Sequence, residues 1–349
     1  RALEGKKFGS GRAYLVSAGK AAWSMAKAAA EYLGEQISKG VVITKYNHSM
    51  GKLNNIEVFE ASHPVPDENS FRATEAALNL TANLDEGDTV LFLLSGGASA
   101  LFEKPLVSGD ELKDLTKQML ACGADIVEIN TIRKRLSAVK GGKFALHCAP
   151  AKVYTIVLSD VIGDPLDMIA SGPAYPDSST CEDALKIVKK YGLTLTERMK
   201  QLLDIETPKE LNNVETHVVG SVKELCRAAE KACLDLGYTP MILTTSLDCE
   251  AREAGRFLAS VARYYADTKK SLAFIAGGET VVMLRGSGKG GRNQELALAA
   301  AEGIRGLKNT AVFSVGSDGT DGPTDAAGGF VDQDTFDNLQ SMNIDIYDI

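Results

Sequence analysis

One stretch, Gly286-Ser-Gly-Lys-Gly-Gly-Arg-Asn-Gln-Glu295, combines glycines and cations in a way that could do chemistry. It lies between an apolar run, residues 272–284, and a segment with helical periodicity, residues 295–304. Glycine lets a backbone turn sharply and present its N–H groups to a ligand. Lys289 and Arg292 would stand at the start of a helix, where the helix dipole repels cations. We therefore expect an anion to complete this site.

A second loop, Gly316-Ser-Asp-Gly-Thr-Asp-Gly-Pro-Thr-Asp325, places aspartates among glycines further along the chain. Mg²⁺ takes oxygen ligands, usually one or two carboxylates together with water and substrate phosphates. Asp318 and Asp321 are therefore predicted to hold Mg²⁺, partly through water. The alternative is that these aspartates are turn residues that cap their own backbone. Phosphate on the first loop and magnesium on the second would form a nucleotide-phosphate site.

Two loops in the N-terminal half also follow strand-like segments. Lys20 comes just after the expected strand 13–18 and stands at a helix start, so it is predicted to meet an anion, with a solvated surface lysine as the alternative. The loop after the apolar strand 90–94 is predicted to bind a phosphate or a carboxylate through backbone N–H groups and hydroxyls, with a plain tight turn as the alternative. The residues of this second loop are Ser95, Gly96, Gly97, Ala98 and Ser99.

Three further segments carry candidate residues. Arg133 and Lys140 lie seven residues apart, hence on one face of an expected helix, and are predicted to bind an anion, although a solvated basic face is the alternative. Asp160 follows the strand 153–158 and is predicted to act as a general base or a metal ligand, although a turn or N-cap carboxylate is equally compatible. His63 begins a Pro-rich turn near the strand ends, where a role in the site stays open.

Composition excludes several classes of protein. The chain has 349 residues and a formal net charge of −8, which argues against nucleic acid or an anionic membrane as a partner. No apolar run approaches the length of a membrane span. The six cysteines form no CxxC pair, so we expect buried thiols in a reducing, cytoplasmic compartment. The chain opens on Arg1, so a preceding segment is expected, and a mitochondrial location stays open if that segment is a transit peptide.

Short strand-like runs alternate with helical periodicity, which is typical of a mostly parallel sheet covered by helices. Around residues 204–213 the pattern breaks into a polar stretch with Pro208, and we place a domain boundary there, giving domains 1–212 and 213–349. The expected strands are 13–18, 41–44, 56–60, 89–94, 152–158, 216–219, 239–244, two adjacent strands around 277–278, and 310–315. The expected helices are 21–33, 68–84, 110–120, 126–139, 182–190, 222–236, 250–265 and 295–304.

Taken together, the motifs resemble those of class II glycerate kinases, which carry a C-terminal domain known as MOFRL. The resemblance covers nearly the whole chain and preserves the order of the motifs. Those that carry it are Ala18-Gly-Lys-Ala-Ala22, Ser95-Gly-Gly-Ala-Ser99, Asn130 with Arg133 through Lys140-Gly-Gly142, Leu158-Ser-Asp160 with Gly163-Asp164, Ser171-Gly-Pro173, Gly277-Gly-Glu279, Gly288–Glu295 and Gly316–Gly322.

The resemblance implies ATP- and Mg²⁺-dependent phosphorylation of D-glycerate, usually to 2-phosphoglycerate. It implies an N-terminal Rossmann-like α/β/α sandwich and a smaller C-terminal α/β domain, with the active site in the cleft between them. The catalytic lysine and arginine of the family fall on Lys20 and Arg292. Lys289 and Glu279 are expected among the residues that bind substrate or nucleotide phosphate, and Asp160 is expected to accept the substrate hydroxyl proton or join the metal.

Some features of the family leave further expectations. The family continues past Ile349, so the C-terminal domain is expected to be incomplete. A homodimer is compatible with the sequence. Three alternative functions stay open: a glycerate kinase that forms 3-phosphoglycerate, an NAD(P)-dependent hydroxypyruvate reductase, and a sugar-phosphate-sensing Rossmann module without enzymatic activity. The reductase rests on Gly286, Gly288 and Gly291, which match G-x-G-x-x-G without an acid near residue 312.

Overall fold

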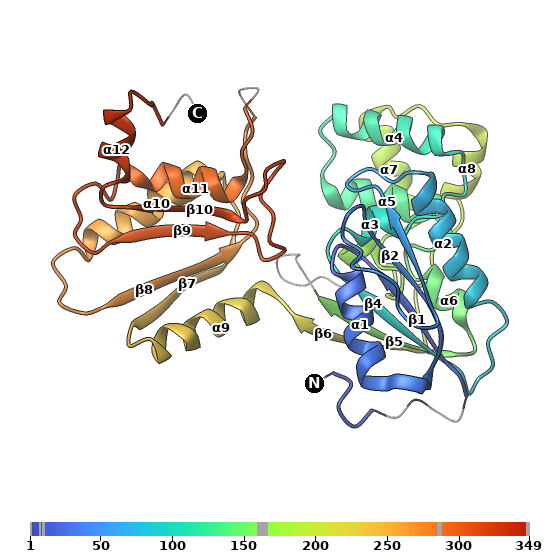
Figure 1. Ribbon diagram of the computed structural model, residues 1–349. Coiled ribbons are helices and arrows are strands. Elements are labelled where there is room, and N and C mark those ends of the chain that lie inside the picture. Colours follow the sequence, from blue (N-terminus) through green and yellow to red (C-terminus); the bar gives the residue numbers. More distant parts are fainter. Residues whose placement is uncertain (1, 7, 9–10, 159–166, 285–287, 347–349) are drawn as a thin grey trace. The chain divides into compact units, whose positions relative to one another are not determined.

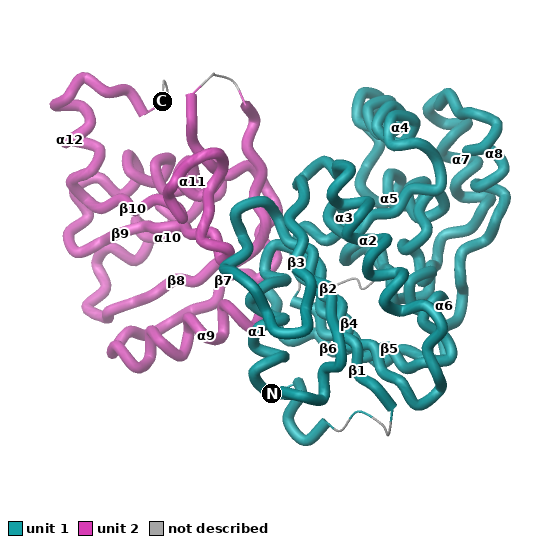
Figure 2. The backbone as a smooth tube through the Cα atoms, turned by 45° about the vertical axis from the view of Figure 1, so that its right-hand side comes forward, with its two compact units in different colours: residues 1–221 teal, residues 222–349 magenta. Residues whose placement is uncertain are grey.

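The computed structural model describes residues 2–6, 8, 11–158, 167–284 and 288–346. The chain divides into two compact units, Arg1–Ser221 and Val222–Ile349 (Figure 2). Each unit has a hydrophobic core of its own.

Unit 1 is built on a six-stranded sheet with the strand order β3-β2-β1-β4-β5-β6 (Figure 1). All neighbouring strands pair in parallel. β1 and β4 lie side by side at the centre, and every residue of both is buried. A parallel strand covered on both faces is a continuous apolar run, which is why both strands could be predicted. The strands are β1 (Ala13–Ala18), β2 (Ile37–Lys45), β3 (Ile56–Ala61), β4 (Thr89–Leu94), β5 (Lys152–Leu158) and β6 (Val214–Gly220).

Helices cover both faces of this sheet. Successive strand residues point to opposite faces and fill two separate cores. Helix α1 (Ala22–Leu33) covers one face, and α2 (Glu68–Leu80), α3 (Ala98–Leu101) and α6 (Lys143–Cys148) cover the other. On the second face the rings of Phe92, Phe102 and Phe144 pack together with centroids 4.7 to 5.4 Å apart. The predicted Rossmann-like α/β/α sandwich is thereby confirmed.

A further group of helices packs on its own apolar cluster at the side of unit 1. Three of these helices begin with a capping box, at Ser108, Asp125 and Thr180, in which the cap side chain accepts from a backbone N–H of the first turn. The helices of this group are α4 (Gly109–Ala121), α5 (Ile126–Leu136), α7 (Cys181–Tyr191) and α8 (Glu197–Leu203). Two short 3₁₀ segments complete the unit, η1 (Gly34–Gln36) and η2 (Ile169–Ser171).

Several sequence-based expectations differ from the structure of unit 1. Helices α3, α6 and α8 were not predicted, and α2 ends at Leu80 rather than at residue 84. The helix expected to reach residue 139 ends at Leu136, because Ser137 adopts extended backbone angles. Arg133 and Lys140 therefore do not share one helix face. The boundary predicted after residue 212 precedes the division at Ser221, because β6 pairs with β5 and completes the first sheet.

Unit 2 contains a parallel pair of strands, β7 (Thr239–Leu247) with β8 (Leu272–Gly278), and an antiparallel pair, β9 (Ala311–Val315) with β10 (Gly328–Asp332). The second strand expected beside β8 is wrong for the described residues, since up to residue 284 only Val281 forms an isolated bridge. β10 was not predicted. The helices are α9 (Val222–Asp235), α10 (Ala251–Tyr264), α11 (Arg292–Ala301) and α12 (Thr335–Ser341).

Among the helices that the structure describes, none is both long enough and apolar enough to cross a bilayer. All six cysteines are free thiols, and two of them, Cys148 and Cys226, are buried. Burial raises the pKa of the Cys148 thiol to about 12, so this side chain stays protonated.

A buried ion cluster joins α5 to the segment before α7 and to the loop after α8. Asp177 is 1% exposed and accepts hydrogen bonds from Lys134 Nζ at 3.0 Å and from Thr207 Oγ1 at 2.8 Å. The guanidinium of Arg135, also buried, lies 3.8 Å from the same carboxylate. Burial opposes ionisation of Asp177, but the charge of Lys134 and the hydrogen bonds outweigh it, so the pKa of Asp177 lies below its ordinary value of 3.8. This basic segment is therefore not a solvated face.

Replacement of Asp177 by Asn tests the cluster. The variant removes the buried carboxylate from Lys134 and Arg135 and leaves them only the more exposed carboxylates of Asp167, at 3.7 Å, and Glu206, at 3.5 Å. Removing one partner of a buried ion pair costs up to about 3–5 kcal/mol of the free energy of unfolding. Since the native pKa of Asp177 is lowered, its stabilisation is present above pH 3.8 and disappears as the pH falls through the native value. Asp177→Asn should therefore be much less stable near neutral pH and should lose less further stability on acidification, as measured by urea unfolding.

The matched control is Asp204→Asn, which removes the charge of an exposed aspartate in the same unit. It should change the free energy of unfolding by no more than about 0.5 kcal/mol. An Asp177→Asn protein as stable as the control would contradict the assignment.

Candidate active site

The strand order of unit 1 reverses between β1 and β4. At such a reversal the loops that leave the two carboxyl ends turn to opposite faces of the sheet, and α/β proteins bind ligands in the crevice that this creates. The loop after β1 carries Lys20, and the loop after β4 carries Ser95, Gly96 and Gly97. Two loops predicted separately from the sequence therefore meet at the position that favours ligand binding.

Hydrogen bonds join these two loops. Lys20 N donates to Gly96 O at 2.8 Å, and Ser95 N donates to Ala18 O at 3.0 Å. The Ser95 hydroxyl accepts from Ala21 N at 3.0 Å, at the start of α1. Of the predicted loop, Ser95 and Ala98 are buried, whereas Gly96, Gly97 and Ser99 are half-buried. Ser95 thus fixes α1 against β4, and the accessible part of the loop lies in the residues that follow it.

Gly97 lets two side chains close over the loop. Its φ of 85° lies in the left-handed region that favours glycine. A Cβ at this position would lie 3.0 Å from Cδ2 of His63 and 3.3 Å from Cγ of Lys20. Both side chains therefore pack against the backbone of Gly97. A larger residue at position 97 would push His63 and Lys20 away from the loop.

The imidazole of His63 is neutral at this site. Burial lowers the pKa of His63, and the charges of Lys20, Lys45 and His48 lower it further, to about 4. A neutral imidazole has one donor and one acceptor nitrogen, so His63 can hydrogen-bond without adding charge. Lys20 then supplies a cation beside an uncharged polar ring.

Arg133 and Lys140 converge on the underside of the same loop. Both donate to Ser99 O, at 3.2 Å from Arg133 Nη2 and 2.7 Å from Lys140 Nζ. Both also pair with the buried Glu103, at 3.4 and 3.6 Å. Lys140 has no exposed surface, and burial lowers its pKa to about 8. The prediction of direct anion binding is therefore corrected for Lys140: the ammonium group holds α3, while Arg133 is slightly exposed.

Glu103 was not identified from the sequence. The signal available was an acid directly after the buried apolar residues Leu101 and Phe102, because a carboxylate in such surroundings requires cationic partners. That reasoning would have linked Glu103 to the basic segment that contains Arg133 and Lys140.

A left-handed backbone segment supports Ser99 from a third direction. Ala170 and Ser171 have φ angles of 54° and 61°, which cost free energy in residues other than glycine and concentrate at functional sites. The Ser171 hydroxyl donates to Asn130 Oδ1 at 3.0 Å and lies 3.5 Å from Ser99 Oγ. This segment belongs to the Ser171-Gly-Pro173 motif identified in the sequence.

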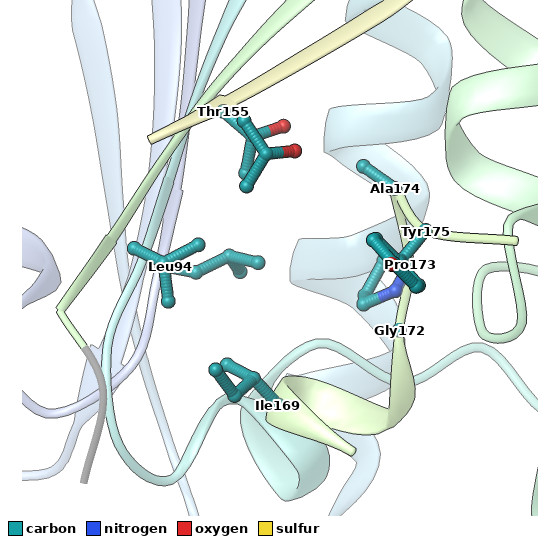
Figure 3. Close-up of a pocket in the computed structure, with 9 residues that line it drawn as sticks. Leu94, Thr155, Ile169, Gly172, Pro173, Ala174 and Tyr175 are labelled. Atoms are coloured by element: carbon teal, nitrogen blue, oxygen red, sulfur yellow. The ribbon is translucent and has the colours of Figure 1, made fainter. Parts of the chain in front are cut away.

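A small pocket lies behind this segment, but its chemistry does not suit an anion. Figure 3 shows Leu94 and Thr155 on one side of the pocket and Pro173, Ala174 and Tyr175 on the opposite side. None of the nine lining residues carries a charge. The loops around Lys20 are therefore the better candidate for binding a phosphate or a carboxylate. Asp160, predicted as a base or metal ligand, lies outside the described residues.

In unit 2 an internal carboxylate occupies the start of α11. Asp321 is 2% exposed and accepts from Asn293 N at 3.1 Å and from Gln294 N at 2.9 Å, besides both of their side-chain amides. A Cβ at Gly291 would lie 2.3 Å from Cγ of Asp321, so only glycine leaves room for this carboxylate. Asp321 thus supplies the anion expected at this helix start. The side chain of Arg292 forms an ion pair with Glu279.

The contacts of Asp321 and Asp318 favour a cap and a turn role over the predicted binding of Mg²⁺. The carboxylate of Asp321 is saturated by four donors, and Asp318 accepts from the backbone N–H and the hydroxyl of Thr320 at 3.1 Å, as a turn residue does. In the described parts of the chain no three His, Cys, Asp or Glu side chains are grouped to hold a metal ion. Lys289 is exposed and forms no ion pair with a described residue.

Comparisons with known proteins show the family to which this chain belongs. The chain matches a family described as "Domain of unknown function (DUF4147)" over residues 3–204 and the MOFRL family over residues 272–349. It is 56% identical to D-glycerate 2-kinase of Thermotoga maritima over 96% of this chain and 82% of that protein. The chain belongs to the class II glycerate kinase family, with a C-terminal MOFRL domain.

Two other matches extend this result. A crystal structure of glycerate kinase from Thermotoga maritima has a TM-score of 0.93 at 54% identity, covering 100% of this chain and 86% of that one. A relative from Agrobacterium vitis with the provisional name of a hydroxypyruvate reductase is 38% identical over 96% of this chain and 79% of that protein.

In this glycerate kinase family member the structure does not support a dinucleotide-binding role for the G-x-G-x-x-G match at Gly286, Gly288 and Gly291. That motif requires a strand directly before the glycine loop and a helix directly after it. Here β8 ends at Gly278, and residues 279–284 separate it from the loop. Gly286 lies outside the described residues.

Replacement of Asp321 by Asn tests whether this residue caps the helix or binds a metal ion. An amide accepts at one oxygen only, so at least one N–H at the start of α11 loses its partner, at a cost of about 1–3 kcal/mol. We expect faster hydrogen exchange at Asn293 and Gln294 and a lower melting temperature, with no change in the Mg²⁺ concentration needed for half-maximal turnover.

Asp318→Asn is the control, because the amide oxygen of Asn can keep the bond to Thr320 N. It should leave both readings unchanged. If Asp321→Asn instead kept its stability and required much more Mg²⁺, Asp321 would be a metal ligand after all.

Proposed function

We propose that this chain transfers the γ-phosphoryl group of ATP to a hydroxyl of D-glycerate, forming 2-phosphoglycerate and ADP. The observation that carries the proposal is the meeting of Lys20 with the 95–97 loop at the reversal of strand order, in a chain of the glycerate kinase family. Assignment to the 2-hydroxyl follows the name of the Thermotoga maritima relative, a D-glycerate 2-kinase.

The reaction requires positioning and charge neutralisation more than covalent help. A bond forms between a glycerate oxygen and the γ-phosphorus while the bond from that phosphorus to the bridging oxygen of ADP breaks. Lys20 is proposed to contact the transferring phosphoryl group, because an ammonium group at a helix start adds its charge to that of the dipole. Asp160 stays the predicted acceptor of the hydroxyl proton.

Mg²⁺ is proposed to enter with ATP, held chiefly by phosphate oxygens and water, as is usual for kinases. The saturation of Asp321 supports this division, because it leaves the protein with few carboxylates to offer in that loop. A cytoplasmic location stays a prediction, supported by six free cysteines, and so does a homodimer.

Phosphorus NMR tests the reaction directly. Incubation of the protein with D-glycerate, ATP and MgCl₂ should give the ³¹P resonance of 2-phosphoglycerate in step with ADP. The resonance of 3-phosphoglycerate would instead correct the position of transfer. Oxidation of NADH by hydroxypyruvate without any phosphoester would establish the reductase, and binding without turnover of either kind would favour the sensing module.

Lys20→Met tests the proposed phosphoryl contact. A lysine at a helix start is unfavourable by about 0.3–1 kcal/mol, so its removal should leave the melting temperature equal or higher. Turnover should fall by about 100-fold or more, because the contact stabilises charge in the transition state. Lys27→Met, on the exposed side of the same helix, is the control and should retain full activity. An active Lys20→Met enzyme would remove Lys20 from the mechanism.

Arg292→Lys tests the second predicted catalytic residue. Lysine keeps the charge but lacks the planar fork that binds two oxygens at once. We expect kcat to fall by about 100-fold, equivalent to about 2.7 kcal/mol, with the melting temperature unchanged. Arg227→Lys, which alters another exposed arginine paired with a glutamate, is the control. Equal activity of the two variants would show that Arg292 serves only its ion pair with Glu279.

A further inference from the structure

Two lysines and a neutral histidine lie at the carboxyl ends of three adjacent strands. Lys20 follows β1, and Lys45 is the last residue of β2. Lys45 is in register with Ala61, the last residue of β3, from which the chain runs through Ser62 to His63. Neighbouring parallel strands end at one edge of the sheet, so these side chains arise next to one another.

Lys45 and His63 differ from the buried cations of the same unit, which pair with internal carboxylates. Within the described residues, the ammonium group of Lys45 forms no ion pair and the ring of His63 forms no hydrogen bond. The charges that act on His63 all belong to cations, Lys20, Lys45 and His48. The two acids nearest to His63 in the sequence accept hydrogen bonds elsewhere: Glu60 from Ser49 N at 2.9 Å and Asp67 from the Tyr46 hydroxyl at 2.6 Å.

We propose that Lys45 and His63 extend the Lys20 site into a subsite for the carboxylate of the substrate and the hydroxyl beside it. Lys45 binds the carboxylate, and the neutral ring of His63 hydrogen-bonds the hydroxyl that accepts the phosphoryl group. This assignment rests on the proposed function. Its basis is the contact of His63 and Lys20 with one patch of backbone at Gly97, which places the ring beside the residue assigned to the transfer.

The chemistry of the group favours glycerate over the nucleotide. Glycerate presents one negative charge and an adjacent alcohol, which match one free ammonium group and one uncharged ring with a donor and an acceptor. A triphosphate instead favours a cradle of backbone N–H groups and several cations. Lys45 and His63 are thus specificity-determining residues for the small acid.

The experiment measures each substrate separately. Calorimetry gives the dissociation constant of D-glycerate without nucleotide, and initial rates give KM for both substrates. Lys45→Met should weaken D-glycerate binding by about tenfold or more, as expected for loss of a charge-assisted contact, with KM for ATP changed by no more than about twofold. His63→Gln should raise KM for D-glycerate in the same way.

Two further variants control the interpretation. Lys45→Arg keeps the charge and should retain most of the affinity, which a defect in folding would not. Lys39→Met removes an exposed lysine of the same strand, toward its other end, and should bind D-glycerate as the parent does.

The outcomes separate this inference from the proposed function. If the parent phosphorylates D-glycerate and Lys45→Met binds it normally, the subsite is refuted while the function stands. If KM for ATP rises instead, the group binds nucleotide phosphate and the inference is likewise overturned. If binding of D-glycerate depends on Lys45 but no phosphoester forms, the subsite stands and the proposed function fails.

Discussion

The pairing of β1 with β4 is the constraint on which the site depends. Both strands are fully buried, so their loops leave the sheet at one edge and must satisfy their backbone groups there. They do so partly with each other, through Lys20 N and Gly96 O. Once the loops are joined, Gly97 leaves room for the side chain of His63, which follows β3. The position of Lys20 therefore follows from the sheet rather than from its own loop.

Internal carboxylates separate the cations that maintain the fold from those that face a ligand. Asp177 neutralises a pair of buried cations, and Glu103 contacts both Arg133 and Lys140. A buried charge without a partner is costly, so each such cation has an acid or a carbonyl within reach. Lys45 and Lys289 are different, because neither forms an ion pair in the described portion of the chain. In this acidic protein the positions proposed to bind anions are those where the described residues place no acid beside a cation.

In unit 2 an internal carboxylate also has a structural role, although its partners are backbone and amide N–H groups rather than cations. Asp321 fills the start of α11 with four hydrogen bonds, which fixes the 288–291 loop against the 316–325 loop. The glycines of that loop therefore serve close packing as well as any ligand. Arg292 begins the helix but is directed to Glu279 rather than to the cap.

Much of the fold was determined by the sequence alone, because a buried parallel strand is a continuous apolar run and a helix has its own period. The same local chemistry identified Lys20 and the 95–99 loop. The partners of charged residues were decided only by tertiary structure. Asp321 became a cap for a helix that precedes it, and Lys140 became a buried support for α3. A carboxylate or an ammonium group chooses among donors and acceptors far away in the chain, and only the folded sheet determines which of them come within hydrogen-bonding distance.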